Sequence, residues 1–187
     1  MLTSDTALRN CRIAALQGAS SAAIQSLLDD FALQVARQGY RIVGVVEHIG
    51  EGKSACGSRA VRDLSTGAVI PISQNLGEGS TACNLDPSGL IEACAAVERA
   101  IAAGADLVVI SKFGKLEAER RGLSGAFRAA VDAGVPILTS VSPAMTDAWR
   151  LFAGPLSQFI GPEVALLHAW WRTASAGLTL AGADRAA

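Results

Sequence analysis

The stretch LQGASSAAIQSLL, residues 16–28, continues the apolar run RIAAL and opens a helical pattern. A glycine between a buried strand and a helix is the usual place of a phosphate-binding loop, whose motif is Gly, four residues, and then Gly-Lys-Ser/Thr. Counting from Gly18 places Ala23, Ile24 and Gln25 at the last three positions. The stretch therefore predicts a strand, a loop and a helix that lack the lysine and the magnesium-binding hydroxyl of this motif.

Outward from this unit, apolar runs alternate with helical patterns along the chain. Strands are predicted at residues 12–17, 40–48, 106–110 and 135–141, and a hairpin of two short strands at 59–73. Helices are predicted at 20–38, 87–104, 123–134, 146–154 and 162–172. We expect an α/β fold of the P-loop-like, three-layer α/β/α kind, with a mostly parallel sheet and an inserted β-hairpin. One domain would cover residues 1–173, followed by a flexible tail over 174–187.

Composition limits the classes of partner. A chain of 187 residues that is 50% hydrophobic can bury a full core. The net charge of -1, without a cluster of Lys and Arg, argues against nucleic acid as a partner. No apolar run reaches about 18 residues, and the start MLTSDTALRN lacks the pattern of a secretory signal. We therefore expect a cytoplasmic protein that does not insert into a membrane and that binds a small molecule.

Polar groups gather where the predicted strands end. Ligands of such sheets bind at this edge. Three strand ends offer hydroxyls, helix N-terminal amides and two lysines, but no carboxylate: Gly18, Ser20, Ser21, Ser111, Lys112, Lys115, Thr139 and Ser140. Such groups can hold a tetrahedral oxyanion (molybdate, tungstate, sulfate or phosphate) without a metal, and they also suit the phosphates of a nucleotide. Simpler interpretations are that Ser20 or Ser21 only caps a helix and that the lysines are solvated surface charges.

The cysteines offer a second kind of site. Cys56 and Cys83 lie in Gly/Ser-rich loops and could ligate a soft metal or a thiophilic molybdenum or copper species, with His48 at a nearby strand end as a further ligand. Their spacing matches no standard metal site, and the chain has no CxxC pair, so free thiols in a reducing compartment are the alternative. The tryptophans at 149, 170 and 171 are interpreted as packing residues, in the core or at the interface of a homo-oligomer.

Further motifs carry a family resemblance. ADLVVISKFGKLEAERRG, residues 105–122, resembles the second signature of a nucleoside-triphosphatase family first known from thermophiles, in which an apolar strand ends in Asp-Glu and continues with Ile-Gly-Lys-Met-Glu. Ser111 and Lys112 stand where the metal-binding aspartate and the water-activating glutamate would be. The stretches VRDLSTG, NLDPSGL and GVPILTSVS follow in that family's order, so the likeness covers residues 10–150. At LQGASSAAIQ, NLDP, FGKLEAE, VSP and DAWR the chain is more similar to domain of unknown function 2478, whose genes tend to lie beside molybdenum-transport genes.

The resemblance implies a degenerate relative of the nucleoside-triphosphatases. With the lysine and both acidic residues absent, we expect no Mg²⁺-dependent catalysis and no enzymatic activity. The leading interpretation is a non-hydrolysing binding protein for an oxyanion, with molybdate preferred because of the genes that accompany the resembled family. One alternative is a residual nucleotide-binding NTPase or nucleotide-dependent switch that uses Lys112 and Lys115. Another is a structural adaptor for a molybdenum transporter or a cofactor-assembly enzyme.

Overall fold

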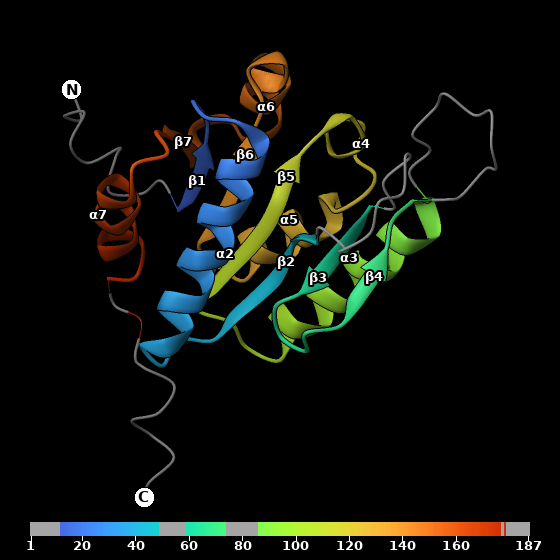
Figure 1. Cartoon of the computed structure of the whole chain (residues 1–187), viewed down its shortest axis with the longest axis horizontal. Coiled ribbons are helices and arrows are strands. Elements are labelled where there is room, and N and C mark those ends of the chain that lie inside the picture. The colour runs from blue at the N-terminus through green and yellow to red at the C-terminus, as the bar shows by residue number, and fades with distance from the viewer. Residues whose placement is uncertain (1–11, 49–58, 74–85, 177, 179–187) are drawn as a thin grey trace, which may run out of the picture.

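A computed structural model of the chain describes residues 12–48, 59–73, 86–176 and 178. The strands of this part are β1 (Ile13–Leu16), β2 (Ile42–His48), β3 (Ala60–Asp63), β4 (Val69–Pro71), β5 (Leu107–Phe113), β6 (Ile137–Val141) and β7 (Ser157–Ile160). They form one seven-stranded sheet in the order β4-β3-β2-β5-β6-β1-β7 (Figure 1). The pairs β2/β5, β5/β6, β6/β1 and β1/β7 are parallel. The β3/β4 hairpin adds two antiparallel strands beside β2, at one edge of the sheet. The predicted mostly parallel sheet with an inserted hairpin is confirmed.

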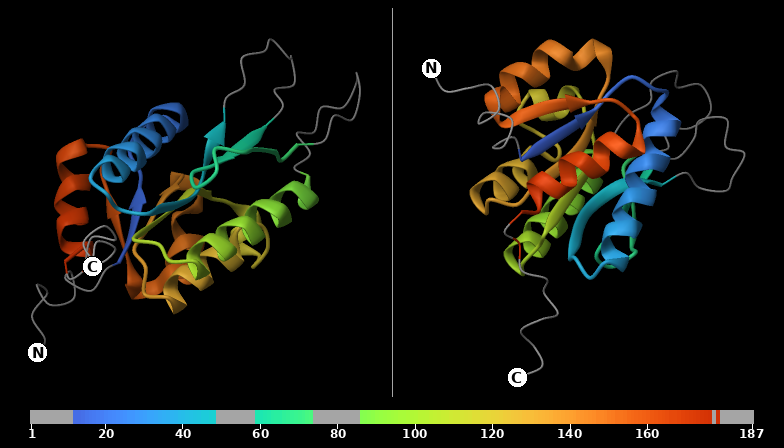
Figure 2. Two further views of the ribbon diagram at one scale, coloured as in Figure 1. Left: turned by 90° about the horizontal axis from the view of Figure 1, so that it is seen from below. Right: turned by 90° about the vertical axis from the view of Figure 1, so that its left-hand side faces the viewer.

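Helices cover both faces of the sheet. α2 (Ser21–Arg37) and α7 (Val164–Ala174) lie on one face, which we call the α2 face, and α3 (Pro87–Ala102), α5 (Ser124–Asp132) and α6 (Thr146–Ala153) lie on the other, the α3 face (Figure 2). The short helix α4 (Lys115–Ala118) follows β5, and the 3₁₀ turns η1 (Pro143–Met145) and η2 (Gly154–Leu156) flank α6. Three layers of this kind match the predicted α/β/α architecture.

Each face has its own apolar core. On the α2 face, the helix residues Leu28, Phe31 and Val35 recur at helical spacing and are buried against β1 and β5. On the α3 face, the fully buried Trp149 contacts Phe113 with ring centroids 5.0 Å apart. Trp149, Trp170 and Trp171 are 0%, 4% and 4% exposed within this single chain. These indoles therefore pack the core and do not form a surface for a second subunit.

Local sequence explains the main element boundaries. Asp86 accepts a hydrogen bond from the Ser88 amide at 2.9 Å and caps α3, whose first residue is Pro87. Gly44 lies within β2 with φ of +119°, and a Cβ there would be 1.9 Å from the Val109 carbonyl oxygen of β5. Only glycine fits this contact, because any side chain would push the two strands apart.

The structure differs most from the prediction at β5 and β7. β5 continues to Phe113 and does not end at Ile110, with an irregular register against β6 between these two residues. β7 (sequence SQFI) was not predicted, and it pairs in parallel with β1 at the sheet edge. Most of the predicted tail, residue 177 and residues 179–187, lies outside the described residues. None of the helices in the described part has the length and hydropathy required to cross a membrane.

Candidate functional site at the carboxyl edge of the sheet

The loop between β1 and α2 forms an exposed helix start. Gly18 has φ of +109°, which lets the chain turn out of the sheet. Ser20 is the N-cap, and its side-chain oxygen accepts a hydrogen bond from the Ala23 amide at 3.3 Å. The amides of Ser21 and Ala22 belong to the first turn, where α-helices have no internal acceptor for them. Gly18, Ser20 and Ser21 are exposed, so this helix start is open to a ligand.

The two motif positions that would contact phosphate and magnesium face inward. Ile24, at the position of the motif lysine, is 5% exposed and belongs to the core of the α2 face. Gln25, at the position of the magnesium-binding hydroxyl, is also 5% exposed. Its Nε2 donates to the Ser111 carbonyl oxygen at 2.7 Å, and its Oε1 accepts from the Glu47 amide at 3.3 Å. Neither side chain is free to contact a bound phosphate.

Gln25 connects α2 to three strands. β5 loses its regular register against β6 between Ile110 and Phe113, and the Ser111 carbonyl lies in this irregular segment. Ser140 of β6 donates its hydroxyl to this same carbonyl at 2.8 Å, and Gln25 Nε2 lies 3.5 Å from the Ser140 Oγ. A carboxamide has one acceptor and two donor hydrogens, which matches the groups that the separating strands expose. Gln25 was not among the predicted site residues.

The two predicted lysines have different environments. The Lys112 Nζ lies 2.9 Å from the Glu47 Oε1, with the Lys112 side chain 43% exposed. The Lys115 side chain is 86% exposed, and its Nζ is 3.9 Å from Glu119. Lys112 therefore keeps a positive charge at the end of β5 but shares it with a carboxylate that the site prediction did not include. Lys115 is a solvated charge on α4.

Thr139 and Ser140 point to opposite faces of the sheet. Thr139 pairs with Ala15 and Ile110, whose side chains belong to the core of the α3 face, whereas Ser140 bonds the Ser111 carbonyl together with Gln25 on the α2 face. This follows from the alternation of side chains along a strand. The Thr139 hydroxyl is fully buried and has no hydrogen-bond partner among the described residues. The structure thus does not bring Thr139 to the helix start of α2.

The FGKLE segment has a structural role in its own loop. Glu117 is 6% exposed and accepts hydrogen bonds from the Gly114 amide at 3.0 Å and the Leu123 amide at 2.9 Å. Its carboxylate thereby closes the turn between β5 and α5. A Cβ at Gly122 would lie 2.3 Å from the Glu117 Oε1, so this glycine makes room for the carboxylate.

The proposed metal ligands are only partly covered by the structure. His48 ends β2 and is half-buried. Cys56 and Cys83 lie outside the described residues, so the soft-metal prediction stays a prediction. Across residues 12–48, 59–73, 86–176 and 178, no three His, Cys, Asp or Glu side chains are grouped to hold a metal ion. The Cys94 thiol is half-buried on α3, and burial raises its pKa above the ordinary value.

The strand order and the helices on both faces define an α/β fold of the P-loop-like, three-layer kind. The solution structure of a human cancer-related nucleoside triphosphatase aligns with a TM-score of 0.55 and 15% identity, over 80% of this chain and 86% of that one. The crystal structure of THEP1 from the hyperthermophile Aquifex aeolicus aligns with a TM-score of 0.53 and 13% identity, over 86% and 94% of the two chains. At such identities the likeness shows the fold alone.

Sequence comparison gives the family. The model of the family described as Protein of unknown function (DUF2478) matches residues 13–170, and the chain belongs to this family. The chain is also 42% identical over 166 residues to Molybdenum import ATP-binding protein ModC 2 of Bradyrhizobium diazoefficiens. The match covers 88% of this chain but only 18% of that protein. The chain thus corresponds to less than a fifth of the length of this relative.

Proposed function

We propose that this domain binds a tetrahedral oxyanion, with molybdate as the first candidate, at the start of α2, and that it does not hydrolyse nucleotides. The observation that carries this proposal is that the two motif positions hold no catalytic group. Ile24 lies in the apolar core, and Gln25 is hydrogen-bonded to β2 and β5. Phosphoryl transfer relies on a lysine at the phosphates, on Mg²⁺ and on a group that orients water. Losing even one preorganised charge-stabilising group costs about 10²-fold or more in rate.

Anion binding needs fewer groups than hydrolysis. The N-terminus of a helix carries about half a positive charge and unpaired amides. The exposed first turn of α2 offers both, with Ser20 and Ser21 as further hydroxyl donors. Lys112 is the less exposed of the two predicted lysines, and its salt bridge to Glu47 means that a bound anion would compete with this carboxylate for the ammonium group. An anion at this edge would draw Lys112 away from Glu47.

The preference for molybdate comes from the relative in Bradyrhizobium diazoefficiens, whose name assigns it to molybdenum import. On the strength of that name, we propose a binding or adaptor module that works with molybdenum transport or cofactor proteins in the cytoplasm. The nucleoside-triphosphatase neighbours support nucleotide binding as a second candidate, because their fold is shared. Titrations with molybdate and with ATP separate the two.

The test is calorimetric titration of the purified protein with molybdate, sulfate and ATP in the absence of Mg²⁺. Lys112→Met removes the cation, and we expect molybdate binding to weaken about threefold to tenfold, since the side chain is half exposed. Glu47→Gln removes the competing carboxylate but keeps the backbone amide that bonds Gln25. We expect this variant to bind molybdate about twofold to fivefold more tightly.

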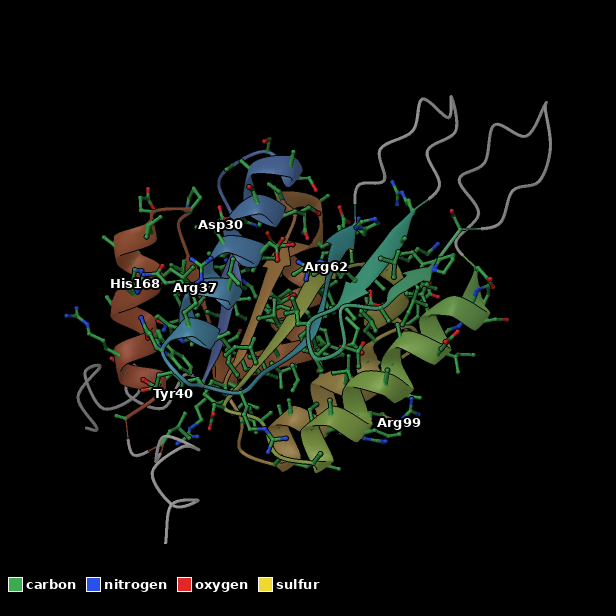
Figure 3. The ribbon with its side chains drawn as sticks, turned by 60° about the horizontal axis from the view of Figure 1, so that its bottom comes forward. Asp30, Arg37, Tyr40, Arg62, Arg99 and His168 are labelled. Atoms are coloured by element: carbon green, nitrogen blue, oxygen red, sulfur yellow. The ribbon has the colours of Figure 1, made fainter. Side chains whose placement is uncertain are left out.

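Arg37→Ala is the matched control. Arg37 is exposed in the last turn of α2, so its replacement removes one positive charge from the same helix at the end away from the site (Figure 3). Its effect on molybdate affinity should stay below about twofold. If Arg37→Ala and Lys112→Met weaken molybdate binding equally, the effect comes from net charge alone, and the proposed site is refuted. Tight ATP binding without molybdate binding would favour the nucleotide-binding alternative, and no binding of either would leave the adaptor.

A further inference from the structure

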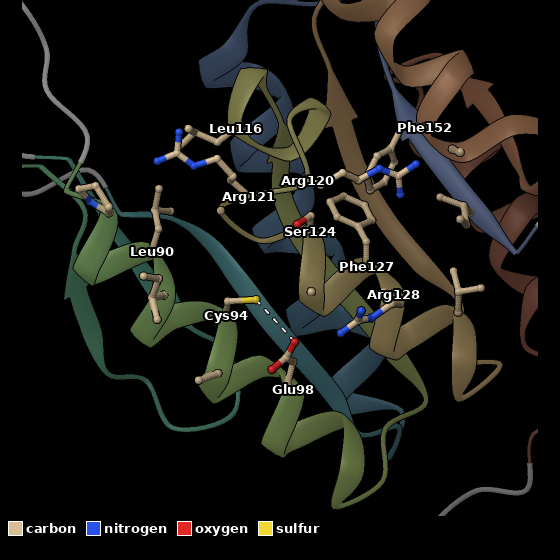
Figure 4. A pocket seen from close by; sticks show the side chains of 18 of the residues that line it. Leu90, Cys94, Glu98, Leu116, Arg120, Arg121, Ser124, Phe127, Arg128 and Phe152 are labelled. Atoms are coloured by element: carbon tan, nitrogen blue, oxygen red, sulfur yellow. Dashed lines mark hydrogen bonds between the residues drawn. The ribbon is translucent and has the colours of Figure 1, made fainter.

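A groove of about 680 Å³ lies on the α3 face, across the sheet from the start of α2. One wall is α3, with Leu90, Cys94 and Glu98, and the floor includes Phe127 of α5 (Figure 4). The opposite side is formed by the turn after α4 and by Phe152 of α6. Apolar side chains dominate the lining, and the volume is within the range of small-molecule sites.

Three arginines border this groove. Arg120 and Arg121 come from the turn after α4, and Arg128 comes from α5, beyond Phe127 as seen from Ser124 (Figure 4). Arg121 is 3.9 Å from Glu119, whereas Arg120 and Arg128 form no ion pair within the described part of the chain. Among the lining residues in the described part of the chain, Glu98 is the only carboxylate. The charge of the groove is therefore positive on its arginine side, which suits an anionic group.

Arg120 is held at the groove by an uncommon backbone conformation. Its φ is +61°, in the left-handed region that favours glycine. Its amide donates to the Glu117 carbonyl at 3.0 Å and the Arg121 amide to the Leu116 carbonyl at 2.8 Å, the pattern of a helix end that glycine usually closes. The guanidinium lies over the Phe152 ring, 4.9 Å from its centroid. Glycine would form this turn with less strain, so the turn itself does not account for an arginine side chain here.

We propose that this groove binds a small organic anion with a planar apolar body, such as an aromatic carboxylate, sulfonate or phosphate ester. The flat body would lie against Phe127, Leu90 and the Arg120–Phe152 pair, and the anionic group would face the guanidinium groups of Arg120 and Arg128. Glu98, on the α3 wall, keeps the anionic group on the arginine side by repulsion. This site is separate from the oxyanion site at α2 and does not depend on it.

The probe is 8-anilino-1-naphthalenesulfonate, an aromatic anion whose fluorescence rises in apolar surroundings, and its uncharged counterpart is N-phenyl-1-naphthylamine. We expect the sulfonate to bind the native protein saturably at one site, with a Kd below about 100 µM. The double variant Arg120→Ala/Arg128→Ala should bind it about tenfold more weakly, while its affinity for the uncharged amine changes by less than about twofold.

Arg99→Ala/Arg172→Ala is the matched control, because both arginines are exposed and neither lines the groove (Figure 3 for Arg99). It loses the same two charges and should bind the sulfonate as the native protein does. Equal weakening in both double variants, or equal weakening for the charged and the uncharged probe, would overturn the proposal. Non-saturable binding would also overturn it. So would a sulfonate affinity that decreases as the protein concentration increases, because that would show that a second copy of the chain covers the groove.

A measurement on the unmutated protein tests the same site even if a variant fails to fold. Cys94 lines the groove, and its Sγ lies 3.9 Å from the Glu98 Oε1. Saturating sulfonate should slow alkylation of the Cys94 peptide, followed by mass spectrometry, by about fivefold or more. An unchanged rate at Cys94 while the sulfonate is bound would place the probe elsewhere and overturn the proposal.

Discussion

The hydrogen bonds of Gln25 can be tested by removing them without changing the shape of the side chain. Gln25→Met keeps the unbranched chain but cannot donate to the Ser111 carbonyl or accept from the Glu47 amide, now bonded at 2.7 and 3.3 Å. The Ser111 carbonyl would keep its bond from Ser140 at 2.8 Å, so the orphaned group is the Glu47 amide. One lost bond and one unsatisfied amide give about 2 kcal/mol of destabilisation.

For a chain of this length that loss lowers the Tm by about 4 to 8 °C. Urea unfolding followed by circular dichroism measures the free energy directly. Gln34→Met is the control, since Gln34 is exposed on the same helix, and it should change the stability by less than about 0.5 kcal/mol. Equal stabilities of the two variants would refute the role assigned to Gln25.

A double-mutant cycle adds a sharper criterion. Ser140→Ala removes the second donor to the Ser111 carbonyl and should cost about 1 kcal/mol alone, because Gln25 still bonds that oxygen. In Gln25→Met/Ser140→Ala the buried carbonyl loses both donors. We therefore expect the double variant to be less stable than the sum of the single effects by about 1 kcal/mol. Additive effects would mean that the two side chains do not share this carbonyl as described.

Three further predictions concern chemistry. With Mg²⁺ and ATP or GTP, the purified protein should release phosphate no faster than a buffer control. We expect the same of the variant Ile24→Lys/Gln25→Ser. Turnover at ordinary NTPase rates of about 1 s⁻¹ or more would contradict this prediction. If a thiophilic metal is held by Cys56 and Cys83, their joint replacement by serine should abolish metal retention in elemental analysis, and unchanged metal content would exclude the thiolate model. Burial raises the pKa of Cys94, so this thiol should be alkylated more slowly than free cysteine at pH 8. Its alkylation rate should still increase with pH above the ordinary thiol pKa. A rate that reaches a plateau at lower pH would contradict this prediction.

Sequence patterns predicted the parts of the fold that depend on local periodicity. The α2 helix, the cap at Asp86 and the hairpin followed from residue spacing and turn chemistry. β7 was missed because SQFI is short and half polar, and it is a strand only through its pairing with β1. The extension of β5 was missed because Ser111 and Lys112 are typical of a polar loop, whereas the tertiary bond from Gln25 satisfies the backbone there.

The candidate site was predicted less well than the fold. The alternation of side chains along a strand is a signal within the sequence that could have separated Thr139 from Ser140. Gln25 also left a signal, as a polar residue on the buried side of α2 between Ile24 and Leu28. The salt bridge from Lys112 to Glu47 could not be predicted, because it joins strands whose order in the sheet does not follow from local patterns.

The β3/β4 hairpin has a consequence for association between copies of the chain. An exposed sheet edge can recruit a strand from another molecule and seed aggregates. Here the edge strand β4 has only three residues, and its last, Pro71, lacks an N–H to donate. A newcomer strand would find few backbone groups to bond along this edge. Growth of the sheet from one molecule into the next is thus disfavoured at β4, and any self-association would have to use side-chain surfaces of the helices or the opposite edge.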